Sequence, residues 1–421
     1  MRSTKYCRPG LLAALALTTS LAITGTAAAQ TLTVWGDENL SDPHVRPLWD
    51  EIAAMFEKDN PGVTVEYMLP TGNISNGAVQ AAIQSNAGPD VMLTNSGIGR
   101  TTIVVNAKLV APLTQYYDEL GWDEKLYPWL YNLLKTQFDG EIYEVPDGVD
   151  AIAMWYHKDL AEENGWVFDA GWDAFEQTLQ KMKDAGMEPI AVGARGCCNG
   201  GHMFGNFLQA AAGRETMGKV VGGEIDWTSE APLTGAEHIV KAVENGWINP
   251  QMSGVDQDGA TRLWANKRAG IFFGGPWFIR NVRQLDYDLT NLGYAPIPSD
   301  VEDGSVPTGG VGWSWYIPST SDEPELASKW IDHILSDEVI KMRIEHPANT
   351  QIMMREIEGV EPGEPAMTPV FDAAAVAVGY NPSVHIPGSA LDTYYQVIGG
   401  LIGGQVSARD GLSQIDSKMG E

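Results

Sequence analysis

The stretch TLTVWGDENLSDPHVRPLWDEIAAMFEKDNPGVTVEY, residues 31–67, decides the fold. Residues 31–35 alternate apolar and polar side chains, which is typical of a strand. Apolar residues then recur at helical spacing from Trp49 to Phe56. Asn60-Pro61-Gly62 ends this helix, and Val63 to Tyr67 is predicted to be the next strand. Strand, helix and strand in so short a stretch indicate a βαβ unit, and therefore a parallel sheet covered on both faces.

The rest of the chain continues to alternate between the strand pattern and the helical pattern of apolar residues. Asp139-Gly140 predicts a hairpin turn between two extended stretches. No hydrophilic linker interrupts the pattern, so we expect two α/β lobes that pack together, with the chain crossing between them near 140–150 and 296–310. Further helices are predicted at 78–85, 172–185, 203–212, 235–245, 259–268, from 277, 324–345, 390–402 and 407–418, and further strands at 90–94 and 269–273.

Composition excludes several classes of protein. The chain has 421 residues, of which 44% are hydrophobic, and 27 basic residues oppose 55 acidic ones, giving a net charge of −28. The composition is that of a globular protein rather than a disordered or collagen-like one. So acidic a surface repels phosphate backbones and anionic lipid, which argues against nucleic-acid binding and membrane docking.

The first 29 residues have the three parts of a secretory signal. Arg2, Lys5 and Arg8 precede an apolar run from 11 to 23, and small residues follow up to Ala29. The run is shorter than the ~20 residues that a membrane span needs, so we prefer a cleaved signal to a membrane anchor. We therefore expect cleavage after Ala29 and a secreted, periplasmic protein.

Motifs for catalysis, cofactors and metals do not appear. The sequence contains no zinc-protease, nucleophile-elbow or P-loop motif, and its seven histidines do not pair at metal-ligand spacing. Asp147 and Asp150 could form the acid–base pair of a glycoside hydrolase, which leaves a secreted carbohydrate-active enzyme as an alternative. Of the three cysteines, Cys197 and Cys198 are adjacent, and the sequence leaves open whether they form a disulfide.

A set of segments, taken in order, resembles one family over nearly all of the chain after residue 29. This family is the family 1 extracellular solute-binding proteins of bacterial ABC importers, the group that includes the maltose-binding protein. The segments are LTVWGDEN (32–39), FEKDNPGVTVEY (56–67), AGPDVMLTN (87–95), DGEIYEVPDGVDAIAMWYHKDL (139–160), GWDAFEQTLQKMKDAG (171–186), LWANKRAGIFFGGPWFIRN (263–281), GYAPIP (293–298), GGVGWSWYIPS (309–319) and ELASKWIDHILSDE (325–338).

The resemblance implies a two-lobed periplasmic-binding-protein fold of α/β class, with a hinge of crossing segments and a ligand cleft between the lobes. We assign residues 1–29 to the signal peptide, 30–145 plus about 300–348 to lobe 1, and 146–299 plus about 349–421 to lobe 2. The implied function is a periplasmic receptor that binds a carbohydrate and delivers it to the permease subunits of an ABC importer. The protein is expected to be a monomer, without cofactor, metal or enzymatic activity. A polyol or glycerol-phosphate ester is the alternative ligand.

The resemblance also implies ligand-binding residues, and it adds to what the residue types suggest. Carboxylates and amides suit the hydroxyls of a sugar, and aromatic faces suit its C–H side. Asp150 aligns with an acidic ligand residue of the maltose-binding protein, and Trp277 follows the Gly-Pro after which relatives stack a sugar. Glycines at 309 and 310 let backbone amides approach a ligand. The full candidate set is Asp37, Glu38, Asn39, Asn95, Ser96, Asp147, Asp150, Arg195, His202, Trp277, Gly309, Gly310, Trp313, Tyr394 and Tyr395.

Overall fold

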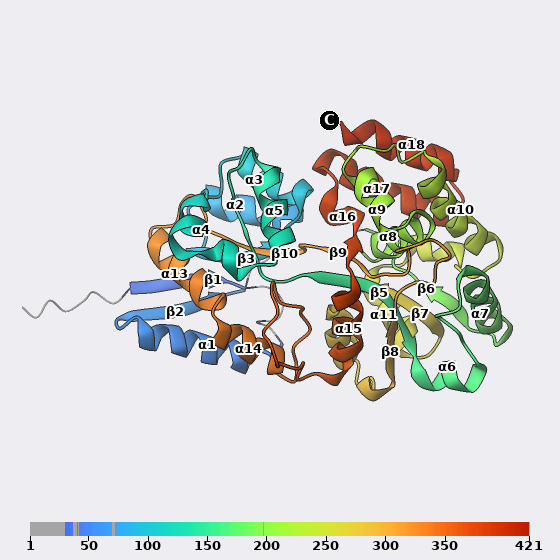
Figure 1. The fold of residues 1–421 in the computed structure, drawn as a ribbon, viewed down its shortest axis with the longest axis horizontal. Helices are drawn as coiled ribbons and strands as arrows, with labels where there is room; N and C mark the ends of the chain where they lie inside the picture. The colour runs from blue at the N-terminus through green and yellow to red at the C-terminus, as the bar shows by residue number, and fades with distance from the viewer. Residues whose placement is uncertain (1–29, 37–39, 41, 70–71, 197, 421) are drawn as a thin grey trace, which may run out of the picture.

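The computed structural model describes residues 30–36, 40, 42–69, 72–196 and 198–420. These residues form two α/β lobes that lie side by side, each with its own sheet and surrounding helices (Figure 1). The fold is therefore of the two-lobed α/β class that the alternating pattern and the resemblance predicted. The described residues include no helix that is long and apolar enough to cross a membrane.

Lobe 1 is built on a five-stranded sheet of order β2-β1-β3-β10-β4. Strands β1, β2 and β3 are parallel, and β10 runs antiparallel to both β3 and β4. The elements of lobe 1 are β1 Gln30–Trp35, α1 Arg46–Asp59, β2 Val63–Met68, α2 Ala78–Gln84, β3 Val91–Asn95, α3 Ile98–Asn106, α4 Thr114–Leu120, α5 Pro128–Gln137, β4 Val145–Pro146, β10 Trp313–Tyr316, α13 Pro324–Ile334 and α14 Asp337–Glu345.

Lobe 2 is built on a six-stranded sheet of order β11-β9-β5-β7-β6, with β8 paired to β5. Its elements are β5 Asp150–His157, α6 Lys158–Asn164, α7 Trp172–Asp184, β6 Glu188–Ala191, α8 Asn199–Ala212, α9 Arg214–Val221, α10 Glu230–Glu244, α11 Gln257–Ala265, β7 Ala269–Gly274, α12 Trp277–Arg283, β8 Leu292–Ala295, β9 Thr308–Gly310, α15 Thr368–Val376, β11 Gly379–Tyr380, α16 Pro382–His385, α17 Gly388–Ile402 and α18 Ala408–Met419. Short 3₁₀ turns complete both lobes.

Within the described part of the chain, three stretches cross between the lobes. The first runs from β4 into β5 and the second from β9 into β10, while the third leads from α14 to α15. Strand β9 pairs with β5 in the second sheet, so the second crossing begins only after residue 310. The two strand crossings lie next to each other because Asp150 pairs with Gly310. These paired strands form the base of the region between the lobes.

Two local predictions of secondary structure were wrong. Asp139 and Gly140 do form a tight turn, with φ of 51° and 95°, but the turn follows helix α5 rather than a strand, so no hairpin is present. The single helix predicted at 324–345 is interrupted at Leu335-Ser336, where Ser336 accepts a hydrogen bond from the Val339 amide and starts α14. A serine at this place caps a new helix, which helical periodicity alone does not reveal.

Candidate functional site

Asp150 begins β5 at the point where the chain enters lobe 2. Gly312 lies against it, since a side chain at that glycine would come within 2.2 Å of Asp150 Oδ2. Part of Asp150 is accessible to solvent, yet the surrounding protein removes most water from its carboxylate. This burial raises the pKa of Asp150 to about 7, and nearby Arg100 acts in the opposite direction. Asp150 therefore changes charge close to neutral pH.

Lobe 2 supplies an imidazole and an indole that contact each other. His202 lies in the first turn of α8, and Trp277 is the first residue of α12; their ring centroids are 5.3 Å apart. His202 is 7% exposed, and its Nδ1 has no hydrogen-bond partner. Burial, together with the charge of Arg100, lowers the pKa of His202 to about 3, so the ring is neutral at physiological pH. A buried nitrogen without a partner is costly unless another molecule satisfies it.

Arg100 lies in the first turn of α3 and reaches from lobe 1 to lobe 2. Its Nη1 donates to the carbonyl oxygens of Ser96 (3.0 Å) and Ser383 (3.1 Å). Its Nη2 donates to the hydroxyl of Tyr395 over 3.5 Å. Because Arg100 acts on the pKa of both Asp150 and His202, these side chains form one group. We call Arg100, Asp150, His202, Trp277 and Tyr395 the interlobe cluster.

The edge of the lobe 1 sheet adds amide and hydroxyl groups beside Arg100. Asn95 ends β3, donates from Nδ2 to Ser75 Oγ over 2.6 Å and accepts from the Ile74 amide. Ser75 Oγ also accepts from Arg100 Nε over 3.1 Å. These groups lie at the carboxyl end of a parallel strand, the edge where open α/β sheets bind their ligands. Titratable, aromatic and amide groups from both lobes and from the hinge therefore lie together.

Comparison with known proteins agrees with this architecture. Residues 42–341 match the family described as bacterial extracellular solute-binding protein. The chain belongs to this family. The maltodextrin-binding protein MdxE of Bacillus subtilis (strain 168) is 22% identical over 298 residues, 67% of this chain and 68% of the relative. A maltooligosaccharide ABC transporter solute-binding lipoprotein of Streptococcus pneumoniae serotype 4 is 23% identical over 357 residues, 78% and 74% of the two chains.

Among solved structures, a chitin oligosaccharide binding protein superposes with a TM-score of 0.75 at 20% sequence identity. The superposition covers 92% of this solute-binding protein and 98% of the chitin oligosaccharide binding protein. At this identity the likeness shows the fold alone. The family match makes this an extracellular protein, as the secretory signal predicted.

The structure brings six of the candidate ligand residues to the region of the cluster, including Ser96, whose carbonyl oxygen accepts from Arg100. His202, Trp277, Asp150 and Tyr395 are members of the interlobe cluster, and Asn95 lies beside it through Ser75. Ser96 is buried next to Asn95, where its amide donates to Gly312 O and its hydroxyl to Val311 O. Asp37, Glu38 and Asn39 lie outside the described residues.

Other candidates have structural partners. Asp147 is fully buried and pairs with Arg343 and the Trp315 indole. Tyr394 is fully buried against Phe204, and its hydroxyl donates to Gly201 O. These side chains fill the lobe cores, and neither is exposed to solvent.

The remaining candidates lie at the hinge or at the surface. Gly309 O accepts from His385 Nε2 over 3.0 Å, Gly310 packs against the same imidazole, and Trp313 is partly buried against the lobe 1 core. Arg195 is exposed and forms an ion pair with Asp256.

Sequence reasoning missed Arg100, although a local signal was present. An arginine in the first turn of a helix faces the positive end of the helix dipole, which is an unfavourable place for a cation. Such a residue indicates that partners outside its helix hold it there. In this protein those partners are carbonyl and hydroxyl groups of both lobes.

A cavity, which we call the hinge-side cavity, lies beside the hinge strands. It has a volume of about 1010 Å³ and is lined from both lobes, by residues that include Val149, Gly310, Trp129 and Val376. Val149 and Asp150 are consecutive strand residues and so point to opposite faces. The cavity walls combine aliphatic side chains with aromatic and charged ones, including Trp129, Tyr380 and Arg355. We prefer the interlobe cluster as the candidate ligand site because it lies at the carboxyl end of β3, where open α/β sheets bind ligands, and because the buried His202 Nδ1 has no hydrogen-bond partner.

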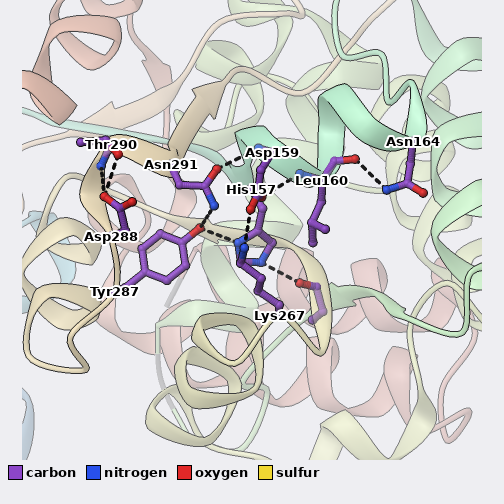
Figure 2. A network of polar contacts seen from close by, with 10 residues as sticks. His157, Asp159, Leu160, Asn164, Lys267, Tyr287, Asp288, Thr290 and Asn291 are labelled. Carbon is purple, nitrogen blue, oxygen red and sulfur yellow. Dashed lines mark hydrogen bonds and ion pairs between the residues drawn. The ribbon is translucent and has the colours of Figure 1, made fainter.

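A second polar network lies at the far end of β5 (Figure 2). His157 Nδ1 contacts the Tyr287 hydroxyl over 2.6 Å, and Nε2 contacts Ala269 O over 3.1 Å. Asn291 donates to the same hydroxyl, and the imidazole stacks on Trp264 at 3.9 Å. An eight-residue strand places this network roughly 23 Å from Asp150, so it stabilises lobe 2 rather than contributing to the site.

The described residues include one disulfide-bonded cysteine and no cluster of metal ligands. Within the described part of the chain, no group of three or more His, Cys, Asp or Glu side chains could hold a metal ion. Cys198 takes part in a disulfide bond, and Cys197 lies outside the described residues.

Proposed function

We propose that this protein is the periplasmic receptor of an ABC importer and that it binds a mono- or oligosaccharide between its lobes, over the interlobe cluster. One observation carries the proposal. The Trp277 indole and the neutral His202 imidazole of lobe 2 lie together with the Asp150 carboxylate at the hinge, and Arg100 approaches them from lobe 1. The family match and the maltodextrin- and maltooligosaccharide-binding relatives support the same ligand class.

The chemistry of the cluster suits an uncharged, hydroxyl-rich ligand. Trp277 offers a partly exposed aromatic face to the C–H side of a sugar ring. Asp150 can accept hydrogen bonds from hydroxyls, and the unpartnered His202 Nδ1 can exchange a hydrogen bond with another. Lobe closure over such a ligand excludes water and strengthens each of these bonds.

Delivery, location and assembly complete the proposal. The receptor would release its ligand to permease subunits of the inner membrane, act as a monomer, and lose its first 29 residues on secretion. N-terminal sequencing of the secreted protein tests cleavage after Ala29, and light scattering of the purified protein tests the monomer.

A thermal-shift screen over carbohydrates and polyols tests the ligand class, because binding to the native state raises the melting temperature. The hits would be measured by calorimetry with wild type and Trp277→Ala. We expect at least one carbohydrate to raise the melting temperature and to be recovered unchanged afterwards. A panel with no hit would reject the ligand class, and release of cleaved products would favour the hydrolase alternative.

A further inference from the structure

We infer that the start of α3 in lobe 1 and the segment α16–α17 in lobe 2 form a closure contact, which sets how far the lobes close. Arg100 is the positioning residue of this contact. The inference deepens the proposed function and rests on it, because lobe closure matters to a receptor that retains its ligand. The contact is defined by Gly97, Gly99 and Arg100 on one side and Val384 and Gly388 on the other.

The two lobes meet here through backbone, without side chains between them. A methyl group on Gly99 would lie 2.9 Å from Gly388 N and 3.0 Å from Ile386 O. A methyl group on Gly388 would lie 2.9 Å from Gly99 O. Both positions are helical and neither has a positive φ. The lack of a side chain is therefore required by the neighbouring lobe and not by the local backbone.

Gly97 extends the same contact. A methyl group there would lie 2.8 Å from both Val384 Cα and Val384 O. Gly97 also has a φ of 101°, so its own conformation favours glycine. For this reason Gly97 is a poor test position, whereas Gly99 and Gly388 report on the distance between the lobes alone.

Arg100 holds the contact together with hydrogen bonds to both sides. Its lobe 1 partners are Ser75 Oγ and Ser96 O, and its lobe 2 partners are Ser383 O and the Tyr395 hydroxyl. The arginine is only 8% exposed. A buried guanidinium is stable only while its donors are satisfied, so separating the lobes would remove two of its partners and admit water in their place.

The same guanidinium connects the contact to the ligand site. Arg100 donates to Ser96 O, the Ser96 amide donates to Gly312 O, and Gly312 lies against Asp150 of the interlobe cluster. After burial, the charge of Arg100 is also a cause of the pKa shifts of Asp150 and His202. A contact that forms when the lobes close acts after the ligand has been captured. Its loss should therefore accelerate ligand dissociation more than it slows association.

Gly99→Ala and Gly388→Ala test the contact from opposite lobes. Alanine is a better helix former than glycine, so neither change should weaken its own helix. Gly399→Ala is the matched control: it lies on α17 like Gly388, but its added methyl meets only Ala194 O, at an ordinary 3.7 Å. Arg100→Met, of similar length, and Arg100→Lys, which keeps a charge and some donors, test the positioning residue.

The separation of the lobes can be measured directly by pulsed electron resonance. Spin labels would be placed at Asp118 on α4 and Glu237 on α10, which are both exposed and lie in different lobes, through non-cysteine chemistry. We expect Gly99→Ala and Gly388→Ala to shift the distance distribution to longer values and Gly399→Ala to leave it unchanged. The carbohydrate identified in the screen should dissociate at least threefold faster from Gly99→Ala and Gly388→Ala than from wild type. The dissociation rate of Arg100→Lys should lie between those of wild type and Arg100→Met.

The two possible failures are distinguishable. If no carbohydrate or polyol binds wild type, the proposed ligand class fails, but the distance distributions still decide whether α3 and α17 hold the lobes together. The closure contact is disproved if the spin-label distance distributions of Gly99→Ala and Gly388→Ala coincide with that of wild type, both in buffer and with any ligand found.

Discussion

Arg343 donates to both carboxylate oxygens of Asp147, from Nη1 to Oδ1 over 2.9 Å and from Nη2 to Oδ2 over 2.7 Å. The Trp315 indole donates to the same Oδ1 over 2.8 Å. Asp147 lies between β4 and β5, while Arg343 lies on α14 and Trp315 on β10. The pair therefore fixes the first hinge crossing to lobe 1, three residues before Asp150 reaches the site.

Replacing Asp147 by asparagine should destabilise the fold strongly. The change leaves Arg343 buried with an uncompensated charge, which typically costs about 3–5 kcal/mol. We expect the free energy of unfolding, measured in urea, to fall by that order. Asp50→Asn is the control, since its ion pair with Arg46 is exposed and such pairs contribute about 0–1 kcal/mol. Equal small losses in both variants would contradict the structural role of Asp147.

Removing the indole of Trp277 should weaken ligand binding without unfolding the protein. Loss of an aromatic face that stacks on a sugar should reduce affinity by about tenfold or more, and Trp277→Phe should retain part of it. Calorimetry with the carbohydrate from the thermal-shift screen would measure both. Trp129→Ala, at an exposed indole beside the hinge-side cavity, should bind normally. If Trp129→Ala loses affinity and Trp277→Ala does not, the site lies on the other face of the hinge.

Ligand affinity should rise as the pH rises through about 7. Burial raises the pKa of Asp150 to about 7, and the ionised carboxylate accepts hydrogen bonds from ligand hydroxyls better than the acid does. Titrations between pH 5.5 and 8.5 should show this increase in wild type and a flat profile in Asp150→Asn. A wild-type affinity that does not change across this range would exclude Asp150 as an acceptor for the ligand.

Asp150 should also affect stability with the opposite sign. Its folded pKa lies above its unfolded value, so its stabilising contribution is complete below pH 3.8 and is lost as the pH rises through about 7. Compared with wild type, Asp150→Asn should therefore gain melting temperature as the pH is raised from 5 to 8.5. A constant difference in melting temperature over this range would show that Asp150 titrates normally.

Stability should fall as the pH drops below 6.5, because three buried histidines are neutral in the folded protein. Burial lowers the pKa of His157 and of His385 to about 4 and that of His202 to about 3. The unfolded chain takes up these protons near pH 6.5, so stability is lost between pH 6.5 and about 4. His157→Gln, in the network of Figure 2, should make the free energy of unfolding, measured in urea, depend less steeply on pH in this range. Replacement of the exposed His44 should leave that pH dependence unchanged.

The alternating α/β architecture was predictable because its signals are local. The periodicity of residues 31–67 identifies strand, helix and strand whatever surrounds them, and β1, α1 and β2 lie where it predicted them. The family resemblance led to Trp277 and Asp150 as candidate ligand residues, and their role in binding stays a prediction. Element boundaries failed at Ser336, where a single cap decides between one helix and two.

The roles of individual acids and of Arg100 could not be read in this way. Asp147 and Asp150 look alike in sequence, yet one meets Arg343, 196 residues away, and the other faces Gly312 and Arg100. Arg100 finds Ser383 283 residues along the chain. The sequence alone determined which segments become strands and helices, because that choice depends on neighbours within a few residues. Only the tertiary structure decided which polar groups are satisfied and which remain available, because burial and charge pairing depend on contacts between segments that are distant in the chain.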